Sequence, residues 1–170
     1  MRNLSDWAVG EVLENVDVRE SGLIMQSNKF YVRQACKDLW EFLDSNNGNI
    51  RSVVGPPGLG KSVAVFMYAI QKAVDCRLVY IQGDAFSKRV IYGKNNEFKA
   101  SKKIMKKNEI LITEWLEHNI RRTDLIVVDG TDSEFIREIM EVHEHISLII
   151  CTSFAPFRLS SEQELKFDVR

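Results

Sequence analysis

Residues 55–62 have the residue types and the spacing of a loop that binds phosphate. They read Gly-Pro-Pro-Gly-Leu-Gly-Lys-Ser and match the Walker A pattern G-x-x-x-x-G-K-[ST]. Glycines let the backbone wrap around a phosphate and turn its N–H groups inward. Lys61 would reach the β- and γ-phosphates, and the Ser62 hydroxyl would bind Mg²⁺. The predicted site for ATP or GTP with Mg²⁺ consists of Gly55, Pro56, Pro57, Gly58, Leu59, Gly60, Lys61, Ser62 and Val63.

Asp129 is the second candidate ligand for the metal. It follows four apolar residues, Leu-Ile-Val-Val at 125–128, as the Walker B carboxylate of P-loop proteins does. A strand that simply ends in an Asp-Gly turn is the alternative. Because the Walker A pattern stands upstream, we favour the metal role and expect Ser62 and Asp129 to hold Mg²⁺ together.

The residues for hydrolysis are incomplete. Many ATPases of this architecture place a glutamate directly after the Walker B aspartate, where it polarises the attacking water, but this sequence has Gly130 there. Asp132 or Glu134 could supply a carboxylate, although Glu134 has the spacing of a helix capping box. Thr152 could hydrogen-bond the γ-phosphate or the attacking water, or could form a turn with Ser153. The predicted catalytic residues are Lys61, Asp129 and Thr152.

Apolar runs that read as strands alternate with helical patterns along the chain. Strands are expected at 50–54, 77–82, 125–129 and 146–151, and helices at 31–43, from 61 or 62 to 74, from about 109 to 120, and after 131. This alternation predicts an α/β three-layer sandwich with a parallel sheet, whose ligand lies at the carboxyl ends of the strands.

The strand count bears on the type of P-loop fold. Four strands favour a P-loop NTPase of the additional-strand (ASCE-like) type with an incomplete core, because a complete core of that type has five. In that type one strand separates the P-loop strand, here 50–54, from the Walker B strand, here 125–129. The two are neighbours in kinase-like folds.

Three regions follow from these patterns. Residues 1–48 are expected to form an N-terminal helical segment that packs on the core and includes a short helix from about Leu4 to Val16. Residues 49–153 would form the P-loop NTPase core with a basic insert at 84–107. Residues 154–170 would form a C-terminal tail, because they show no clear periodicity.

The basic insert is a candidate surface for nucleic acid. It holds eight Lys and Arg residues, all within 88–107, against two acidic residues. The aromatic residues of the lysine-rich stretch 88–107, Tyr92 and Phe98, are too few for a base-stacking platform. A solvated surface segment is therefore the favoured interpretation, and the net charge of −1 gives the whole chain no attraction to nucleic acid.

Composition favours a soluble intracellular protein without membrane contact. The three cysteines are widely spaced, form no metal-ligand pattern and read as reduced core residues. No apolar run approaches the roughly 18 residues that a membrane-spanning helix needs. The first residues lack the apolar core of a secretory signal.

Three segments resemble one family of P-loop proteins. They read Phe-Tyr-Val-Arg-Gln-Ala-Cys-Lys-Asp-Leu-Trp at 30–40, Val-Val-Gly-Pro-Pro-Gly-Leu-Gly-Lys-Ser-Val at 53–63 and Val-Val-Asp-Gly at 127–130. They resemble the P-loop ATPase domain of the Crinkler (crinkling-and-necrosis) effectors and the related retrotransposon-hot-spot proteins, over roughly residues 29–153. The resemblance implies nucleotide contacts from Gly58, Gly60, Lys61 and Ser62, metal binding by Asp129, and Asp-Gly as the usual Walker B ending.

The same resemblance implies a biological setting. Such proteins act as effectors or chromosome-associated NTPases, often with a separate toxic or nuclease domain, and the effectors are secreted and delivered into a host cell. This chain departs from that pattern, because it shows no translocation segment of the Leu-Phe-Leu-Ala-Lys type and leaves no room for a C-terminal effector domain. We therefore expect a fragment, an isolated ATPase module or a truncated paralogue.

Three functions remain open from the sequence. The first is an NTPase module that binds Mg²⁺ and ATP, hydrolyses it weakly and passes a conformational change to a protein partner. The second is a nucleotide-gated or hydrolysis-dead module for protein interaction, which Gly130, the missing lid domain and the missing fifth strand favour. The third is a small-molecule or nucleoside kinase with the basic insert as a lid, although no acceptor-site motif is present.

Overall fold

The described part of the chain covers most of the expected core. The computed structural model describes residues 4–14, 29–45, 49–83, 87–94, 97–105, 114, 116, 118, 120, 124–130, 133–142, 146–153 and 163–166. Within these ranges, no helix combines the length and the apolar character needed to cross a bilayer.

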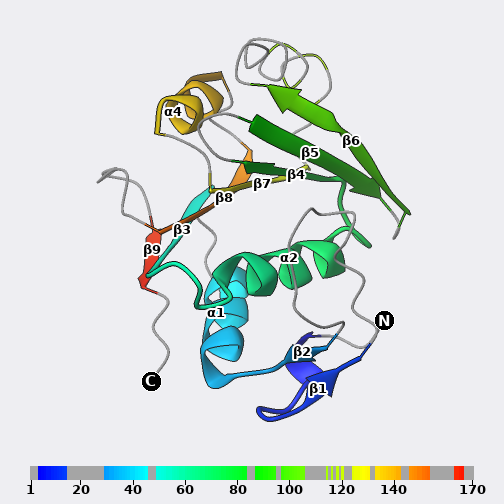
Figure 1. Cartoon of the computed structure of the whole chain (residues 1–170), viewed down its shortest axis with the longest axis vertical. Helices are drawn as coiled ribbons and strands as arrows, with labels where there is room; N and C mark the ends of the chain where they lie inside the picture. Colours follow the sequence, from blue (N-terminus) through cyan, green and yellow to red (C-terminus); the bar gives the residue numbers. More distant parts are fainter. Residues whose placement is uncertain are drawn as a thin grey trace.

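A seven-stranded sheet forms the centre of the molecule (Figure 1), with the strand order β6-β5-β4-β7-β8-β3-β9. The four strands expected from the sequence are all present: β3 (Ile50–Val54), β4 (Leu78–Gly83), β7 (Leu125–Asp129) and β8 (Ser147–Thr152). They pair in parallel. The predicted α/β class with a parallel sheet is therefore confirmed.

Strand β8 lies between β3 and β7. Residues 50–54 of β3 pair with 148–152 of β8, and residues 147–151 of β8 pair in turn with β7. The expectation that one strand separates the strand before the glycine loop from the strand that ends in Asp129 is thus confirmed.

A fifth parallel strand corrects the expected strand count. Strand β9 (Gln163–Lys166) pairs with residues 51–54 of β3 at the edge of the sheet. The prediction of four strands and an irregular tail at 154–170 is wrong at this point. The strand reads Gln-Glu-Leu-Lys, and backbone pairing at an edge requires no apolar run that a sequence pattern could reveal. Residues 154–162 and 167–170 of the expected tail lie outside the described residues.

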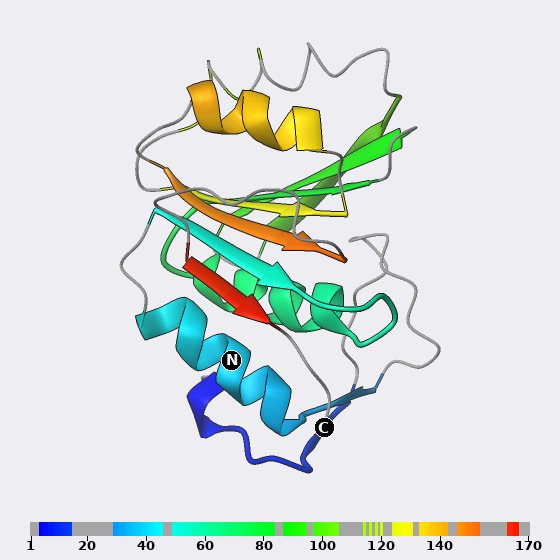
Figure 2. The ribbon, with the colours of Figure 1, turned by 90° about the vertical axis from the view of Figure 1, so that its left-hand side faces the viewer.

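Helices cover both faces of the sheet (Figure 2). Helices α1 (Gln34–Ser45) and α2 (Lys61–Lys72) lie on one face and α4 (Ser133–Val142) lies on the other, which gives three layers. Helix α1 is tied to α2 by a buried hydrogen bond from Trp40 Nε1 to the Ala64 carbonyl oxygen, at 3.0 Å. Most of the helix expected at about 109–120 lies outside the described residues.

The central strands β4, β7 and β8 are mainly apolar because both faces of the sheet are covered there. Side chains that pack with α1 and α2 include Leu78, Tyr80, Leu125, Val127, Ile149 and Cys151. Side chains that pack with the opposite helix layer include Val79, Ile81, Ile126, Val128, Leu148 and Ile150. Successive strand residues point to opposite faces, so Asp129, two residues after Val127, lies on the face that α2 covers.

The basic insert continues the sheet. Strands β5 (Ser87–Lys94) and β6 (Glu97–Met105) form an antiparallel hairpin, and β5 pairs antiparallel with β4. Residues 84–86, 95–96 and 106–107 of the insert, and the side chains of its lysines, lie outside the described part. A nucleic-acid role for residues 88–107 therefore stays a prediction.

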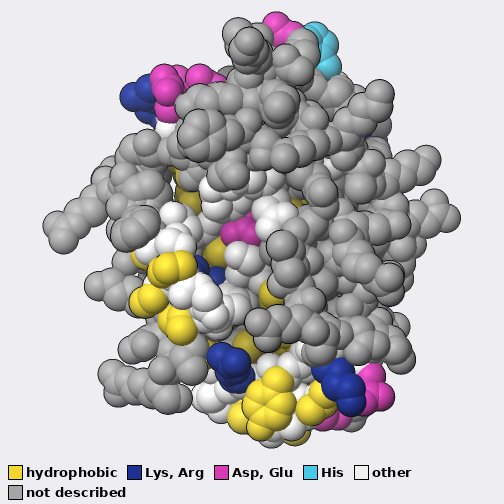
Figure 3. Space-filling view, viewed as in Figure 1, with side chains coloured by type: hydrophobic (Ala, Val, Ile, Leu, Met, Phe, Trp, Pro, Cys, Tyr) yellow, Lys and Arg dark blue, Asp and Glu magenta, His cyan; other side chains and the backbone are white. Residues whose placement is uncertain are grey.

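In the N-terminal segment the helix expected at 31–43 is present as α1 (Gln34–Ser45), but the first residues differ from their expected helical form. A 3-10 turn, η1 (Leu4–Asp6), is followed by β1 (Val12–Leu13), which pairs antiparallel with β2 (Phe30–Tyr31). The predicted helix from Leu4 toward Val16 is therefore wrong over residues 4–13. Gly10 has φ 92°, which is outside the helical region, and its N–H donates to the Val32 carbonyl at 2.9 Å. Hydrophobic side chains gather over β1 and β2 at the lower end of the molecule in Figure 3.

Candidate functional site

The loop at 55–60 joins β3 to α2 and requires two glycines. Gly58 has φ 80° and Gly60 has φ 86°, both in the left-handed region that other residues rarely adopt. A Cβ at either position would meet no atom within 4 Å, so conformation and not space demands glycine here. Gly60 is also the N-cap of α2 and offers no side-chain cap. The first N–H groups of the helix are thus left for a ligand.

Lys61 opens α2 with its amino group folded over the loop. Nζ donates a hydrogen bond to the Pro56 carbonyl oxygen at 2.7 Å, and the residue is 5% exposed. The predicted phosphate-binding lysine therefore lies inside its own loop. An anionic ligand would compete with the Pro56 carbonyl for this cation.

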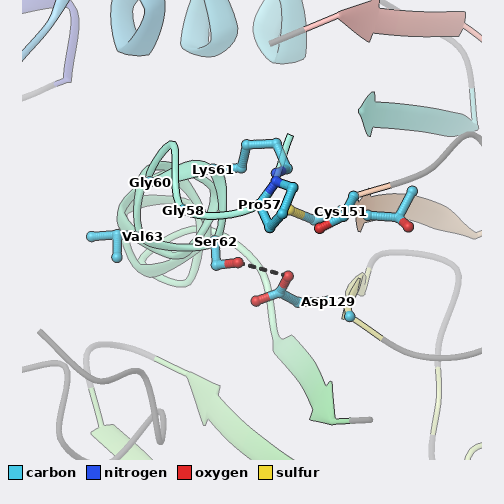
Figure 4. A pocket seen from close by; sticks show the side chains of 11 residues that line it. Pro57, Gly58, Gly60, Lys61, Ser62, Val63, Asp129 and Cys151 are labelled. Carbon is cyan, nitrogen blue, oxygen red and sulfur yellow. Dashed lines mark hydrogen bonds between the residues drawn. The ribbon is translucent and has the colours of Figure 1, made fainter. Parts of the chain in front are cut away.

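Ser62 contacts Asp129 directly. Its Oγ donates a hydrogen bond to Asp129 Oδ1 at 2.9 Å, and Figure 4 shows the two side chains pointing toward each other. Ser62 stands in the first turn of α2 and Asp129 ends β7. The two residues predicted to hold the metal are therefore adjacent in space.

Asp129 is a buried carboxyl group. It is 4% exposed, and Tyr80 donates a hydrogen bond from its hydroxyl to Oδ2 at 2.7 Å. Burial raises the pKa of Asp129, while its hydrogen bonds with Tyr80, Ser62 and Cys151 and the charge of Lys61 lower that pKa and offset part of the rise. The hydrogen-bond donors thus stabilise the ionised form of a buried carboxyl group.

A cavity of about 400 Å³ opens over these residues. Its lining contains Pro57, Gly58, Gly60, Lys61, Ser62, Val63, Asp129, Gly130, Cys151, Thr152 and Ser153. The fold thus brings all three predicted catalytic residues and most of the predicted nucleotide-binding residues to one cavity. Gly55, Pro56 and Leu59 belong to the same loop but do not line it. In Figure 3, acidic and basic side-chain atoms lie close together near the middle of this face.

The oxygen atoms at the site fit Mg²⁺. Adjacent ligands of an octahedral Mg²⁺, at roughly 2.0–2.1 Å, lie about 2.9 Å from each other. Ser62 Oγ and Asp129 Oδ1 are 2.9 Å apart, the distance of their hydrogen bond, so both oxygens could bind one ion without a change in their separation. Among the described residues, no group of three or more His, Cys, Asp or Glu side chains could hold a metal ion. Mg²⁺ commonly takes one or two protein oxygens and completes its shell with phosphate and water. The pair therefore suits a metal that arrives with a nucleotide.

The position after Asp129 is built for glycine. Gly130 has φ 71°, and a Cβ there would lie 3.0 Å from the Gly83 carbonyl oxygen. Its N–H donates to the Cys151 carbonyl at 3.0 Å, which holds this turn against β8. A glutamate cannot replace this residue without moving the backbone. Of the alternative carboxylates, Glu134 is exposed in the first turn of α4, and Asp132 lies outside the described residues.

Sequence reasoning missed two residues of the site. Tyr80 lies within the apolar run of β4 and read as a core residue, as did Cys151 in β8. Both are buried on the α2 face. Burial and the neighbouring Asp129 raise the pKa of the Cys151 thiol well above its usual range. The signal was available for Tyr80: a hydroxyl in a buried strand needs a polar partner.

No protein-family model matches the chain, and a search of curated proteins finds no significant match.

Proposed function

We propose that this protein binds a nucleoside triphosphate together with Mg²⁺ in the cavity between the 55–63 loop and Asp129. The observation that carries the proposal is the hydrogen bond from Ser62 Oγ to Asp129 Oδ1 at 2.9 Å. It joins a hydroxyl and a carboxylate that both suit Mg²⁺, beside an ammonium group and the uncapped start of a helix. ATP or GTP is the class of ligand with this combination of phosphates and metal.

The strand order supports a P-loop NTPase of the additional-strand type. The parallel strands run β4-β7-β8-β3-β9, with one strand between the loop strand and the Asp129 strand and a fifth strand at the edge. The cavity lies at the carboxyl ends of β3, β7 and β8, where open α/β sheets bind their ligands. The same strand order disfavours a small-molecule or nucleoside kinase, because in kinase-like folds the strand before the P-loop and the strand that ends in the Walker B aspartate are neighbours.

Each residue of the cavity has a distinct task in this proposal. The loop N–H groups and the start of α2 bind the phosphates, and Lys61 exchanges its bond to the Pro56 carbonyl for a phosphate oxygen. Ser62 and Asp129 hold Mg²⁺, which would neutralise phosphate charge when bound. Thr152 lines the cavity from the end of β8, where a hydroxyl can donate to the γ-phosphate or to water.

Weak hydrolysis fits the chain better than fast turnover. No carboxylate follows Asp129, and any side chain at Gly130 would be strained by φ 71° and by a Cβ 3.0 Å from the Gly83 carbonyl oxygen. A water molecule in the cavity would therefore lack a strong general base. The same observation favours a second candidate, a nucleotide-gated module that binds without hydrolysis and signals to a protein partner. The resemblance to Crinkler and retrotransposon-hot-spot proteins adds a setting to either candidate: we propose that the module acts inside a host cell, as the Crinkler effectors do.

A titration with paired variants tests binding. Fluorescent ATP and GTP analogues are titrated into the wild type, Lys61→Ala and Lys72→Ala, with Mg²⁺ and with EDTA. Lys72 is the matched control, because it lies at the other end of α2 and pairs with Asp44 outside the cavity. We expect Lys61→Ala to weaken binding about 10- to 100-fold, the loss of a charge-assisted hydrogen bond, and Lys72→Ala to bind as the wild type does. Equal affinity in all three proteins would refute the proposed site.

Phosphate release separates the two candidates. Weak hydrolysis predicts release by the wild type that is slower than roughly 1 s⁻¹, the low end of typical enzymes, and that disappears in Lys61→Ala. Tight binding with no release above the Lys61→Ala background would select the nucleotide-gated module.

A further inference from the structure

Tyr80 reaches the candidate site from a strand that no nucleotide-binding pattern includes. It lies in β4, which pairs in parallel with β7, and its Cα partner is Val127. The side chain is fully buried, and its hydroxyl donates to Asp129 Oδ2 at 2.7 Å. The residue therefore approaches the carboxylate from the buried interface between the sheet and α2.

The ring of Tyr80 is held in place by α2. It packs edge to face against Phe66, with centroids 5.0 Å apart and an interplanar angle of 80°. The hydroxyl lies 3.5 Å from the Ser62 carbonyl oxygen, which is beyond a good O–H···O distance, so its proton belongs to Asp129. Packing of this kind fixes where the hydroxyl points.

Two hydroxyl donors divide the Asp129 carboxylate between them. Ser62 binds Oδ1 and Tyr80 binds Oδ2. Together with the Cys151 thiol, which also hydrogen-bonds this carboxylate, they restrict its rotation about the Cβ–Cγ bond, and Tyr80 is the donor that holds Oδ2. Metal binding at Ser62 and Oδ1 would leave the bond from Tyr80 to Oδ2 in place.

We propose that Tyr80 is a positioning residue for the metal site, which holds Asp129 so that Oδ1 faces Ser62. This inference rests on the proposed function and names a further residue for it. Partners behind a metal ligand orient that ligand, and their loss typically lowers metal affinity by about 10- to 100-fold. Tyr80 touches neither the cavity nor the nucleotide, so its effect passes through Asp129.

A purely structural role for the hydroxyl predicts something different. Loss of a buried hydrogen bond lowers stability wherever it lies, but it changes the response to Mg²⁺ only if the bond orients a ligand. Tyr68 supplies the matched control. It is likewise buried, and its hydroxyl bonds to the Leu43 carbonyl at 3.1 Å and to Asp44 at 3.0 Å, outside the cavity.

The test is a Mg²⁺ titration at a fixed concentration of fluorescent ATP, with Tyr80→Phe, Tyr68→Phe and the wild type. We expect Tyr80→Phe to raise the half-saturating Mg²⁺ concentration about tenfold and to leave nucleotide binding in EDTA unchanged. We expect Tyr68→Phe to lower the melting temperature and to leave both binding values unchanged. Phe66→Leu keeps every polar group but removes the ring that supports Tyr80, and should shift the Mg²⁺ concentration in the same direction by less.

The outcomes separate this inference from the function beneath it. A wild type with no Mg²⁺-dependent binding overturns both. A wild type that responds to Mg²⁺, with Tyr80→Phe responding at the same concentration, overturns the positioning role alone. Equal loss of binding with Mg²⁺ and in EDTA would also overturn it, because that pattern reports general damage. Should Tyr80→Phe fail to fold, an unchanged Mg²⁺ response of Phe66→Leu overturns it.

Discussion

Ser62 and Asp129 stand 67 positions apart in the sequence, yet the Ser62 hydroxyl donates a hydrogen bond to the Asp129 carboxylate at 2.9 Å. The contact exists because α2 covers the sheet face on which Asp129 lies and because β3 and β7 end at the same edge, with β8 between them. Two residues chosen for metal chemistry from separate patterns thus meet in one cavity.

The first prediction concerns metal dependence. Ser62→Ala removes one oxygen ligand, and Asp129→Asn removes the negative charge of the other. Each should therefore lower the apparent Mg²⁺ affinity at least about tenfold. Binding of ATP in EDTA should change little. Ser52→Ala is the control, because Ser52 is buried in β3 and its Oγ has no hydrogen-bond partner among the described residues. Mg²⁺ titrations monitored by fluorescent ATP measure all three, and an unchanged Ser62→Ala would count against the metal site.

The second prediction is that Asp129→Asn stabilises the protein in the absence of ligand. Burial raises the pKa of Asp129 above its ordinary value of 3.8, so the ionised carboxyl opposes folding. The neutral amide removes that cost: its oxygen can still accept from Ser62, and its NH2 group can donate to the Tyr80 hydroxyl oxygen in place of the bond that Tyr80 donates to Oδ2. Urea unfolding at pH 7 should therefore give a higher free energy of unfolding for the variant. A lower value would mean that the hydrogen bonds to the carboxylate outweigh its burial.

The third prediction concerns how the stabilisation by Asp129→Asn depends on pH. A carboxyl whose pKa is raised on folding stabilises the native state below pH 3.8, and this contribution is lost as the pH rises through the folded pKa. The stability advantage of Asp129→Asn over the wild type should therefore be small near pH 3.8, grow as the pH rises and then level off. Unfolding curves from pH 3.5 to 8 measure it, and an advantage that shrinks with rising pH contradicts it.

The fourth prediction compares two glycines. Gly58→Ala faces only the strain of φ 80° in open space and should cost about 1–2 kcal/mol. Gly130→Ala has φ 71° and also places its Cβ 3.0 Å from the Gly83 carbonyl, so it should cost more. Urea unfolding ranks the two. By the same reasoning Gly130→Glu should destabilise the turn without creating rapid hydrolysis, and fast phosphate release by that variant would be the contrary result.

The fifth prediction concerns the cysteines. Cys36 and Cys151 are buried, Cys76 is half-buried, and burial raises the pKa of all three thiols. A thiol that is protonated and shielded reacts slowly. A disulfide reagent at pH 8 should therefore label Cys76 first and the other two only on unfolding. Rapid labelling of Cys151 in the native protein would show that the cavity opens farther than in this structure.

Local patterns in the sequence were enough to predict the parallel sheet and the meeting of the loop with Asp129. Buried parallel strands are apolar on both faces, and a glycine loop after such a strand has a fixed offset to its lysine and serine. The carboxyl ends of parallel strands lie at one edge of the sheet, so the loop after β3 and Asp129 at the end of β7 were expected to lie close together. Each of these features depends on a short stretch of sequence.

The features that were missed depend on contacts between distant residues. Tyr80 read as one more apolar strand residue, because only the register of β4 against β7 brings its hydroxyl to Asp129. Strand β9 has no apolar run, and backbone pairing with β3 alone defines it. The predicted N-terminal helix is wrong because the positive φ of Gly10 and the pairing of β1 with β2 override the helical periodicity of the sequence.

The most direct test of the proposed nucleotide site is a calorimetric titration of ATP into the wild-type protein, once with Mg²⁺ and once with EDTA. Ligation by Ser62 and Asp129 predicts one binding site per chain and tighter binding with Mg²⁺, with the Mg²⁺ gain absent in Ser62→Ala. GTP in place of ATP identifies the preferred base. No binding heat with either nucleotide, or equal affinity with and without Mg²⁺, would contradict the account.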